Sequence, residues 1–423
     1  MAGYTTKNNH ERIGNIIIGV LETSLICLII MYTRTIYAHL SNVNLHLNII
    51  LSVVLALLLL SNLLFGKFSK NNAKKYSKYL FAYYIFIFVY LVFSNIGDRS
   101  FFANFFFVLP GFLILLLFNK DENYFKRLFI KFIYVTVALA VVSLVFYIVG
   151  SLTNIISPNI NANYDWSGER ISSSYFFLHF NTQRVGTFGL QIWRNTGIFT
   201  EAPMYSLVLS AALAMNMFAI NTKKKTSRLF SAIIAITIIS TFSATGLVVV
   251  TLSIIAKVFL GLKDKKAVFR VLLAIATLAL IALCVLTVGA RSKMSTGSIR
   301  LDDYRASFKA WADHPLLGNG YNNEDAIRKY MSLDRSDYGL SNTLGVVLAE
   351  GGIYLTLFYL SPIIILLISY AKNKKYEQFI FYFLFLVLIS TCIFVYTPLM
   401  FLMITAAYNS VIKRRWIDEK VGN

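Results

Sequence analysis

Apolar segments of about twenty residues follow one another along most of this chain, separated by short polar stretches. Such a segment is long enough to cross the ~30 Å hydrocarbon core of a bilayer as one α-helix. Two apolar runs, 229–262 and 378–412, exceed a single crossing, because one helix over the first would extend about 51 Å. Both runs have basic clusters at each end, which predicts two crossings in each. We expect their turns near 243–246 and at Thr397-Pro398.

The pattern therefore predicts an all-α, polytopic membrane protein with about twelve transmembrane helices, forming a single membrane domain over 1–423. The expected spans are 13–32, 47–66, 79–97, 101–118, 128–152, 199–220, two within 229–262, 269–290, one within 342–371 and two within 378–412. Continuous apolar runs favour helices over a β-barrel, whose strands would be short and would alternate between apolar and polar residues.

Composition agrees with a membrane protein. Hydrophobic residues make up 57% of the chain and charged residues 14%, with a mean hydropathy of +0.64, whereas soluble domains carry roughly 25% charged residues. The net charge of +20 arises mostly from Lys clusters beside the spans, as the positive-inside rule requires, so we expect no nucleic-acid partner. Cys27, Cys284 and Cys392 lie inside apolar segments, which predicts packing roles and neither a disulfide nor a metal site. Residues 1–12 are polar and precede a run long enough to stay in the membrane, so we expect no cleavable signal peptide.

Two long polar stretches, 153–197 and 291–341, interrupt the series of spans. If the Lys-rich loops and both termini are cytoplasmic, both stretches are extracytoplasmic loops on the same face. They favour Arg where the inner loops favour Lys, and Arg binds phosphate and carboxylate groups through two parallel hydrogen bonds. Acidic residues nearly balance the arginines of the second loop, so surface ion pairs are the alternative role for any one of them.

The first polar stretch ends in WRNTGIFTEAP, which contains two candidate site residues, Arg194 and Glu201. We expect Thr200 to cap the following helix, with Pro203 in its first turn. An ionised Glu in lipid costs roughly 2.5–3.5 kcal/mol, so Glu201 at the membrane edge needs a partner or water. We interpret the pattern as an Arg–carboxylate pair facing an aqueous cavity; simple helix capping is the alternative.

The second polar stretch contains a predicted helix that ends at His314-Pro315 and leads into a Gly-Asn-Gly turn. Its apolar stripe is expected to consist of Leu301, Tyr304, Phe308 and Trp311, flanked by Arg300 and Arg305. Packing is the usual role of an aromatic stripe at helical spacing, and stacking against sugar rings is the alternative.

A third group of polar residues begins the next span. Ser341 and Asn342 are expected to cap its helix, and Glu350 follows inside an apolar run, directly before Gly351-Gly352. A buried Glu beside two glycines predicts a broken or re-entrant helix in a closely packed region. Alternatively, Glu350 pairs with a nearby Arg and holds the loop in place.

These groups, in this order, resemble the Wzy-type O-antigen and capsular polysaccharide polymerases and the related O-antigen ligases. The resemblance is carried by Arg194 with GIFTEAP, the turn SATG, Arg300 and Trp311 with HPLLGNG, and Ser341-Asn342 with Glu350-Gly351-Gly352. Each motif is weak alone, and the ordered set is more specific.

The resemblance implies a GT-C-like glycosyltransferase in the bacterial cytoplasmic membrane, with its active site on the extracytoplasmic face. Such an enzyme would transfer the glycan growing on one undecaprenyl diphosphate to the non-reducing sugar of a second undecaprenyl-diphosphate-linked repeat unit. Its partners would be this lipid-linked oligosaccharide and membrane lipid, with flippase and chain-length regulator proteins as candidate protein partners. No motif is typical of a divalent-metal site, so we expect neither a metal nor another cofactor.

The implied chemistry needs a stabilised leaving diphosphate and an oriented, deprotonated acceptor hydroxyl. We predict that Arg194 and Arg300 bind the diphosphate, with Arg305 as the third choice. Glu201 is the candidate base or acceptor-positioning acid, with orientation of the arginines as the alternative. The remaining candidates for substrate binding are Ser341, Asn342, Glu350, Tyr304 and Trp311.

A polysaccharide flippase is the alternative from another class, because it too would have twelve to fourteen spans with Arg and Glu in the membrane. A transporter would show paired halves and charges deep in several spans, whereas this chain concentrates its polar residues in two loops. An O-antigen ligase and a non-catalytic membrane partner are further alternatives. The ligases typically carry His where Ser341 stands, so Ser341 favours a polymerase. The absence of this His leaves the identity of the catalytic base undetermined.

Overall fold

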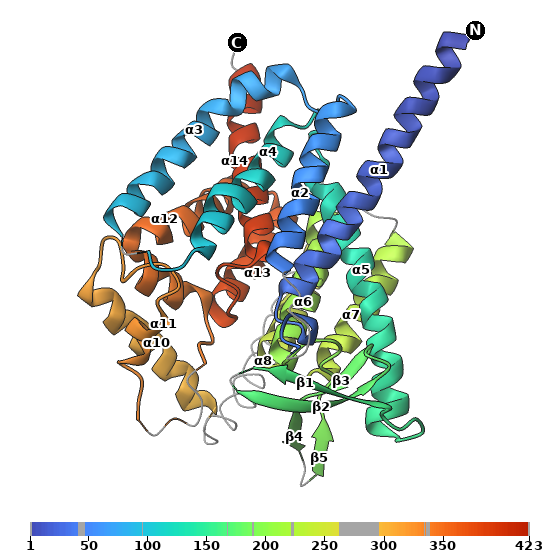
Figure 1. Ribbon diagram of the computed structural model, residues 1–423, viewed down its shortest axis with the longest axis vertical. Helices are drawn as coiled ribbons and strands as arrows, with labels where there is room; N and C mark the ends of the chain where they lie inside the picture. Colours follow the sequence, from blue (N-terminus) through green and yellow to red (C-terminus); the bar gives the residue numbers. More distant parts are fainter. Residues whose placement is uncertain are drawn as a thin grey trace.

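The computed structural model describes residues 2–40, 47–94, 96–166, 168–187, 190–220, 224–261, 296–333, 335 and 339–421; the expected span at 269–290 lies outside them. Helices dominate (Figure 1): α1 (Ala2–Tyr32), α2 (Leu47–Leu64), α3 (Lys70–Phe93), α4 (Leu109–Phe118), α5 (Tyr124–Phe146), α6 (Ala202–Ala214), α7 (Lys224–Ser240), α8 (Ala244–Gly261), α10 (Thr296–Asp313), α11 (Glu324–Arg328), α12 (Thr343–Lys372), α13 (Tyr376–Thr391) and α14 (Pro398–Val421). π-Helical turns at Phe102–Val108, Tyr147–Leu152 and Met215–Ala219 adjoin α4, α5 and α6.

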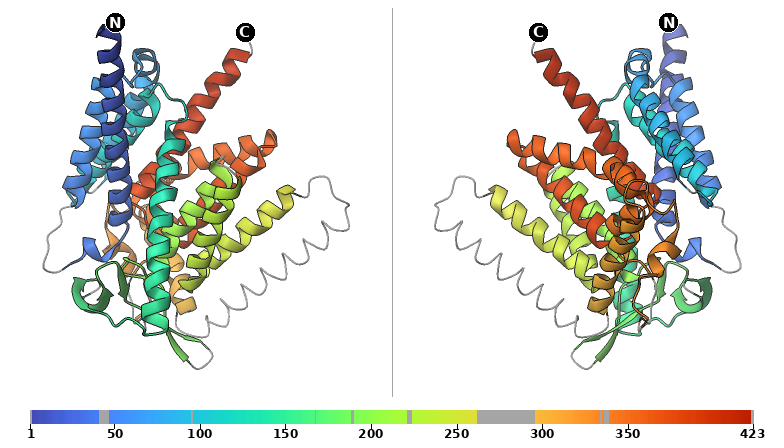
Figure 2. Two further views of the ribbon diagram at one scale, coloured as in Figure 1. Left: turned by 90° about the vertical axis from the view of Figure 1, so that its right-hand side faces the viewer. Right: turned by 90° about the vertical axis from the view of Figure 1, so that its left-hand side faces the viewer.

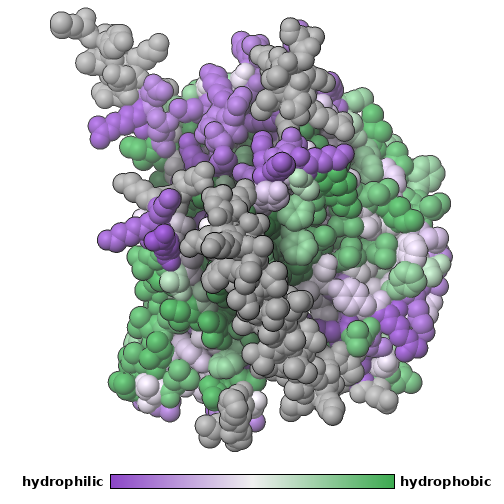
Figure 3. Space-filling model, turned by 180° about the vertical axis from the view of Figure 1, so that it is seen from behind, coloured by the Kyte–Doolittle hydropathy of each residue, from purple (hydrophilic) through white to green (hydrophobic). Residues whose placement is uncertain are grey.

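The helices form a membrane-embedded bundle. In the described part of the chain, seven helices are long and apolar enough to cross a membrane, and three shorter apolar helices accompany them. Large apolar side chains such as Leu64, Phe81 and Phe93 face outward and are 68–69% exposed, as expected for contact with lipid. Figure 3 shows hydrophobic surface along the flank and hydrophilic residues gathered at the end that carries the termini. The chain is therefore a multi-pass membrane protein; the total of about twelve spans stays a prediction.

Both long apolar runs are divided as expected. α7 ends at Ser240 and α8 begins at Ala244, so a tight turn separates two short helices. α13 ends at Thr391 and α14 begins at Pro398, whose fixed φ suits the first position of a helix. The first of these turns becomes part of the candidate site.

α6 lies at the centre of the bundle, with α5, α7, α8 and α13 packed around it. Every residue of α6 except Pro203 is buried, which is typical of a helix that is apolar on all sides. Small side chains allow close approach: a Cβ added to Gly246 of α8 would lie 2.1 Å from Oγ of Ser206. α6 thereby holds the start of α8 in a defined position.

Figures 1 and 2 show the strands, α10 and α11 at the end of the molecule remote from both termini. The described parts of both polar stretches thus lie at the same end of the bundle. The side of the membrane that this end faces stays a prediction.

The expectation of an all-α chain is wrong for the first polar stretch. It forms two antiparallel sheets, β1-β2-β3 and β4-β5, from β1 (Ile160–Asp165), β2 (Glu169–Tyr175), β3 (His179–Asn181), β4 (Arg184–Thr187) and β5 (Leu190–Trp193). In β1 the side chains alternate, with Ala162 and Tyr164 buried and their neighbours exposed. This period of two is the signal of a half-buried strand. The sheets position Arg194, which directly follows β5.

Candidate active site

Arg194 reaches the turn between α7 and α8. Its Nε donates to the carbonyl oxygen of Thr241 at 2.9 Å, and its Nη2 donates to that of Phe242 at 3.4 Å. Nη1 donates to Oε1 of Gln183 at 3.2 Å. The guanidinium is therefore fixed beside the start of α8.

Arg300, the second candidate arginine, belongs to the second polar stretch. It is a half-buried residue of α10, and its charge acts on the Tyr304 phenol and on the Cys392 thiol. Cys392 shares a hydrogen bond with Thr245 in the first turn of α8. The guanidinium of Arg300 takes part in none of the ion pairs found among the described residues. The structure thus places Arg194 at the turn before α8, and Arg300 near Cys392, which lies beside the first turn of α8.

This arrangement is suited to an anion. The first turn of α8 offers N–H groups that the helix itself does not bond, together with the positive end of the helix dipole. Two guanidiniums add charge and directional donors, which favour phosphate oxygens. Fixed donors of this kind stabilise negative charge that develops on a leaving group.

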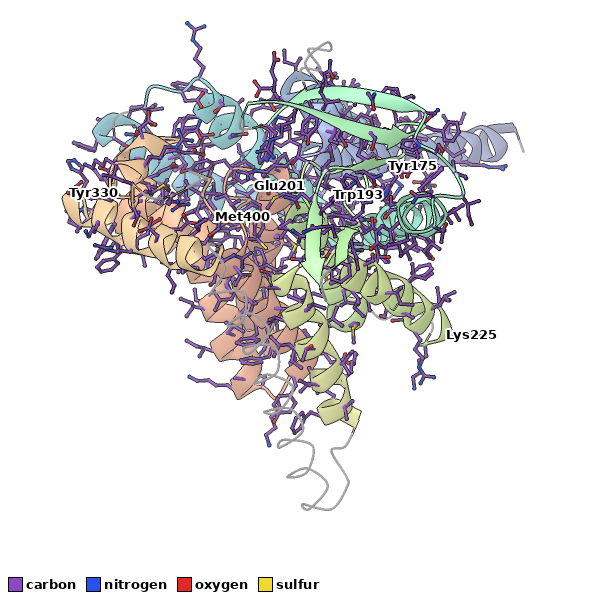
Figure 4. All side chains as sticks on the ribbon, turned by 90° about the horizontal axis from the view of Figure 1, so that it is seen from below. Tyr175, Trp193, Glu201, Lys225, Tyr330 and Met400 are labelled. Carbon is purple, nitrogen blue, oxygen red and sulfur yellow. The ribbon has the colours of Figure 1, made fainter. Side chains whose placement is uncertain are left out.

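Glu201 lies near the centre of the end that carries the strands, between Trp193 and Tyr330 (Figure 4). It occupies the N-cap position of α6, and its Oε1 accepts a 2.8 Å hydrogen bond from Nε1 of Trp166. Its charge acts on Arg34. The carboxylate therefore has an indole partner and an arginine nearby that the sequence pattern did not reveal.

The expectation that Thr200 caps α6 is wrong. Its hydroxyl donates to the carbonyl oxygen of Arg34 at 3.1 Å, because the segment before α6 pairs with the chain that follows α1. Oε1 of Gln183 instead accepts the first N–H of α6, from Ala202, at 3.0 Å. Since Gln183 also binds Arg194, it links the candidate anion site to the start of α6.

Arg34 has a positive φ of 58°, and its guanidinium lies 4.8 Å from the ring centroid of Trp166. Burial lowers the pKa of Arg34, and the charges of Glu201 and Glu324 act in the opposite direction. A basic residue after the first span, on the predicted outer side, runs against the positive-inside rule. That departure is the signal by which the sequence could have identified Arg34.

A cavity of about 730 Å³ opens beside these residues. Its polar lining includes Arg34, His39, Trp166, Asn322, Glu324 and Glu350. The segment 393–397 forms one wall, directly after Cys392, which lies close to Arg300. The cavity and the candidate anion site therefore share the segment between α13 and α14.

Glu350 is 1% exposed and lines this cavity. Its Oε2 accepts hydrogen bonds from the Tyr396 hydroxyl at 2.7 Å and from the Asn322 N–H at 3.0 Å. Its backbone carbonyl accepts from the Tyr90 hydroxyl at 2.9 Å and from the Gly320 N–H at 3.0 Å. The partners of Glu350 are thus phenols and backbone amides rather than an arginine.

The predicted helix break after Glu350 is confirmed. Gly352, at φ 60° and ψ −163°, interrupts α12, and the loop after α10 docks into the break. The Ile353 N–H donates to the carbonyl oxygen of Pro315 at 3.0 Å, and the Asn319 N–H donates to that of Ala349 at 2.9 Å. Loop hydrogen bonds replace those that the helix loses, so the backbone at Glu350 is held on both sides.

The aromatic stripe of α10 faces outward. Tyr304 is 40% exposed and Phe308 58%, whereas Nε1 of Trp311 donates to a backbone carbonyl at 3.0 Å. Arg305 is also exposed and does not converge with Arg194. The buried face of α10 consists of Asp302, Asp303, Ala306, Ser307 and Ala310. Packing of the stripe into the protein core is therefore not its role.

Asn342 caps α12, as expected, because its Oδ1 accepts the Gly345 N–H at 2.6 Å. Ser341 hydrogen-bonds the buried carboxylate of Asp303, to which Arg335 donates at 2.7 Å. Burial raises the pKa of Asp303, and the bonds from Ser341 and Arg335 act in the opposite direction. The Ser341 hydroxyl thus helps to join the start of α12 to α10.

Ser341→Ala is expected to lower the free energy of unfolding by about 1 kcal/mol, the value of one hydrogen bond. Thermal unfolding in detergent measures it, with Ser77→Ala, at an exposed position of α3, as the control. An unchanged unfolding temperature would contradict the role of this bond, and a lower polymerisation rate at equal stability would instead place the hydroxyl on the sugar.

The fold and the geometry define a multi-pass membrane protein with a candidate anion site and a large cavity that several charged and polar residues help to line. In comparisons with known proteins, residues 229–360 match a family model described as O-Antigen ligase. The match covers less than half of the chain and includes α8, α10 and Glu350, but not Arg194 or Glu201. It supports a relation to the O-antigen ligases and polymerases and does not distinguish between them. No curated protein matches the chain.

Proposed function

We propose that this chain is a polysaccharide polymerase. It transfers a growing glycan from undecaprenyl diphosphate onto another undecaprenyl-diphosphate-linked repeat unit, on the extracytoplasmic face of the bacterial cytoplasmic membrane. The proposal is supported by the hydrogen bonds of Arg194 to the turn before α8 and by the position of Arg300 near Cys392, which lies beside the first turn of α8. The cavity of about 730 Å³ next to it offers room for sugars.

In this proposal Arg194 and Arg300 bind the diphosphate of the donor and stabilise it as it leaves, without a metal. Glu201 is a positioning residue, because its carboxylate holds Trp166, over whose ring Arg34 lies. Hydrogen bonds from Asn342 and Ser341 to sugar remain part of the proposal.

The outward stripe of α10 supports a path for the glycan. Tyr304 and Phe308 present exposed rings, Trp311 lies one turn further on, and Arg305 is exposed beside them. Aromatic faces with polar neighbours suit sugar rings and their hydroxyls. Flippase and chain-length regulator proteins are the proposed protein partners, because the repeat unit has to be delivered and the polymer length set.

A ligase and a flippase are the competing functions. Ser341 stands where the related ligases typically carry His, which favours the polymerase. A flippase would carry its charges deep in several spans. Here the two candidate arginines, Arg194 and Arg300, come instead from the polar stretches at one end.

Purified protein in detergent, given a lipid-linked repeat unit and EDTA, is expected to produce a ladder of polymer on a gel. The reaction needs only the donor, the acceptor and the protein, and EDTA tests whether it is independent of divalent metal. A ladder that appears only without EDTA would contradict the metal-independent mechanism. Absence of any ladder, with translocation of the same lipid across vesicles, would instead identify a flippase.

A further inference from the structure

One oxygen of the Glu350 carboxylate, Oε1, has no hydrogen-bond partner among the described residues, although the side chain is 1% exposed. A buried acceptor left without a donor costs about 1–3 kcal/mol. Glu350 lines the large cavity, so a hydroxyl group bound there can supply the missing hydrogen bond. A ligand in the cavity that donates a hydrogen bond to this oxygen would remove that cost.

The other oxygen is fixed. Oε2 takes both the Tyr396 hydroxyl and the Asn322 N–H, which come from two segments on either side of the carboxylate. The break at Gly352 and the docked loop hold the backbone of the same residue. Because Oε2 already accepts two hydrogen bonds and Oε1 accepts none, Oε1 is the oxygen that can accept a proton from a ligand.

The helix that carries Glu350 begins beside Cys392, on whose thiol the charge of Arg300 acts. Near Arg300, the N–H of Thr343 donates to the carbonyl oxygen of Cys392 at 2.8 Å. Glu350 lies seven residues further along α12, a rise of about 10 Å. If Glu350 takes part in the transfer, the donor sugar and its diphosphate lie between Glu350 and the two arginines.

We infer that Glu350 is the general base of glycosyl transfer, acting on the acceptor hydroxyl. The inference rests on the proposed polymerase activity. The hydroxyl oxygen forms the new bond to the anomeric carbon of the donor glycan. The bond from that carbon to the diphosphate oxygen breaks, and the electron pair leaves with undecaprenyl diphosphate beside Arg194 and Arg300. The hydroxyl proton passes to Oε1 of Glu350 and later returns to solvent.

Glu201, the base candidate suggested by the sequence pattern, is less suited to this role. Its Oε1 accepts the hydrogen bond from Trp166, and it is not among the residues that line the cavity. Its position at the start of α6 instead allows it to orient Trp166 and Arg34.

Glu350→Gln tests the inference with little change in shape. The amide oxygen can occupy the place of Oε2 and keep both of its donors, and the NH₂ group then takes the place of the open Oε1. We expect kcat for polymer formation to fall by ~10²–10⁴-fold, the usual contribution of general-base catalysis. KM for the lipid-linked repeat unit and the unfolding temperature should stay near their wild-type values.

Glu377→Gln is the matched control, because Glu377 pairs with Lys257 at the start of α13 and does not line the large cavity. A second variant, Glu350→Ala, should regain part of its rate when formate is added as a small carboxylate base, which a structural role would not permit. A wild-type rate in Glu350→Gln, or a loss of rate accompanied by a raised KM or a lowered unfolding temperature, would overturn the inference. Failure of the wild-type protein to form any ladder would instead refute the proposed function itself.

Discussion

Arg300→Ala is expected to reduce polymer formation by ~10²–10³-fold while the protein stays folded and in the membrane. Arg300 has no ion pair among the described residues, so its removal leaves no carboxylate buried without its cation. Arg194 is a less clean target, because its guanidinium also bonds the carbonyls of the α7–α8 turn. Initial rates of ladder formation, at matched amounts of folded protein, measure the effect. Arg300→Lys should recover only part of the rate, because an ammonium lacks the planar donor fork.

Lys309→Ala is the control for Arg300→Ala. Lys309 is an exposed cation on the same helix, and its ammonium lies 6.0 Å from the ring centroid of Tyr330. Its removal changes the net charge equally but leaves the anion site intact. A rate for Arg300→Ala within about three-fold of the wild type would show that Arg300 does not contribute to the candidate anion site. A comparable loss in Lys309→Ala would assign the effect to the overall positive field of this end.

The length of apolar runs predicted the helices well, because each span must satisfy its own backbone hydrogen bonds in lipid. The same logic predicted the divided run around Pro398 and the broken helix at Glu350, where a carboxylate and two glycines fit no ordinary span. The positions of candidate site residues in the polar loops were harder to predict. Arg194 and Arg300 were identified as candidates, yet only the fold shows that Arg194 bonds the turn before α8.

The errors arise where tertiary packing overrides local pattern. The aromatic stripe of α10 suggested a buried face, whereas Ala306, Ser307 and Ala310 are the residues that pack inward. Close approach to α12 requires such small side chains: a Cβ on Gly345 would lie 2.9 Å from Oγ of Ser307. Arg34 was missed because its role depends on Trp166, more than a hundred residues away.

Gly352→Ala is expected to unfold the candidate site, with a loss of more than about 4 kcal/mol in the free energy of unfolding. The backbone of Gly352, at φ 60° and ψ −163°, occupies a region that only glycine adopts readily. An added Cβ would also lie 2.4 Å from the carbonyl oxygen of Leu316 and 2.6 Å from the nitrogen of Gly318. Neither backbone atom can move aside, because the loop that contains them is bonded to α12 by Ile353.

Gly66→Ala separates the backbone penalty at positive φ from the steric clash of the added Cβ. Gly66 has a similar φ of 63°, but nothing lies within 4 Å of an added Cβ, so only the backbone penalty of about 1–2 kcal/mol is expected. Thermal unfolding in detergent should therefore show a much larger decrease for Gly352→Ala than for Gly66→Ala. Polymer formation should be lost only in the former, because displacement of the loop also moves Asn322 away from Oε2 of Glu350. Equal decreases would mean that the loop does not constrain the break, and Glu350 would then lack the rigid support on which its role as a base depends.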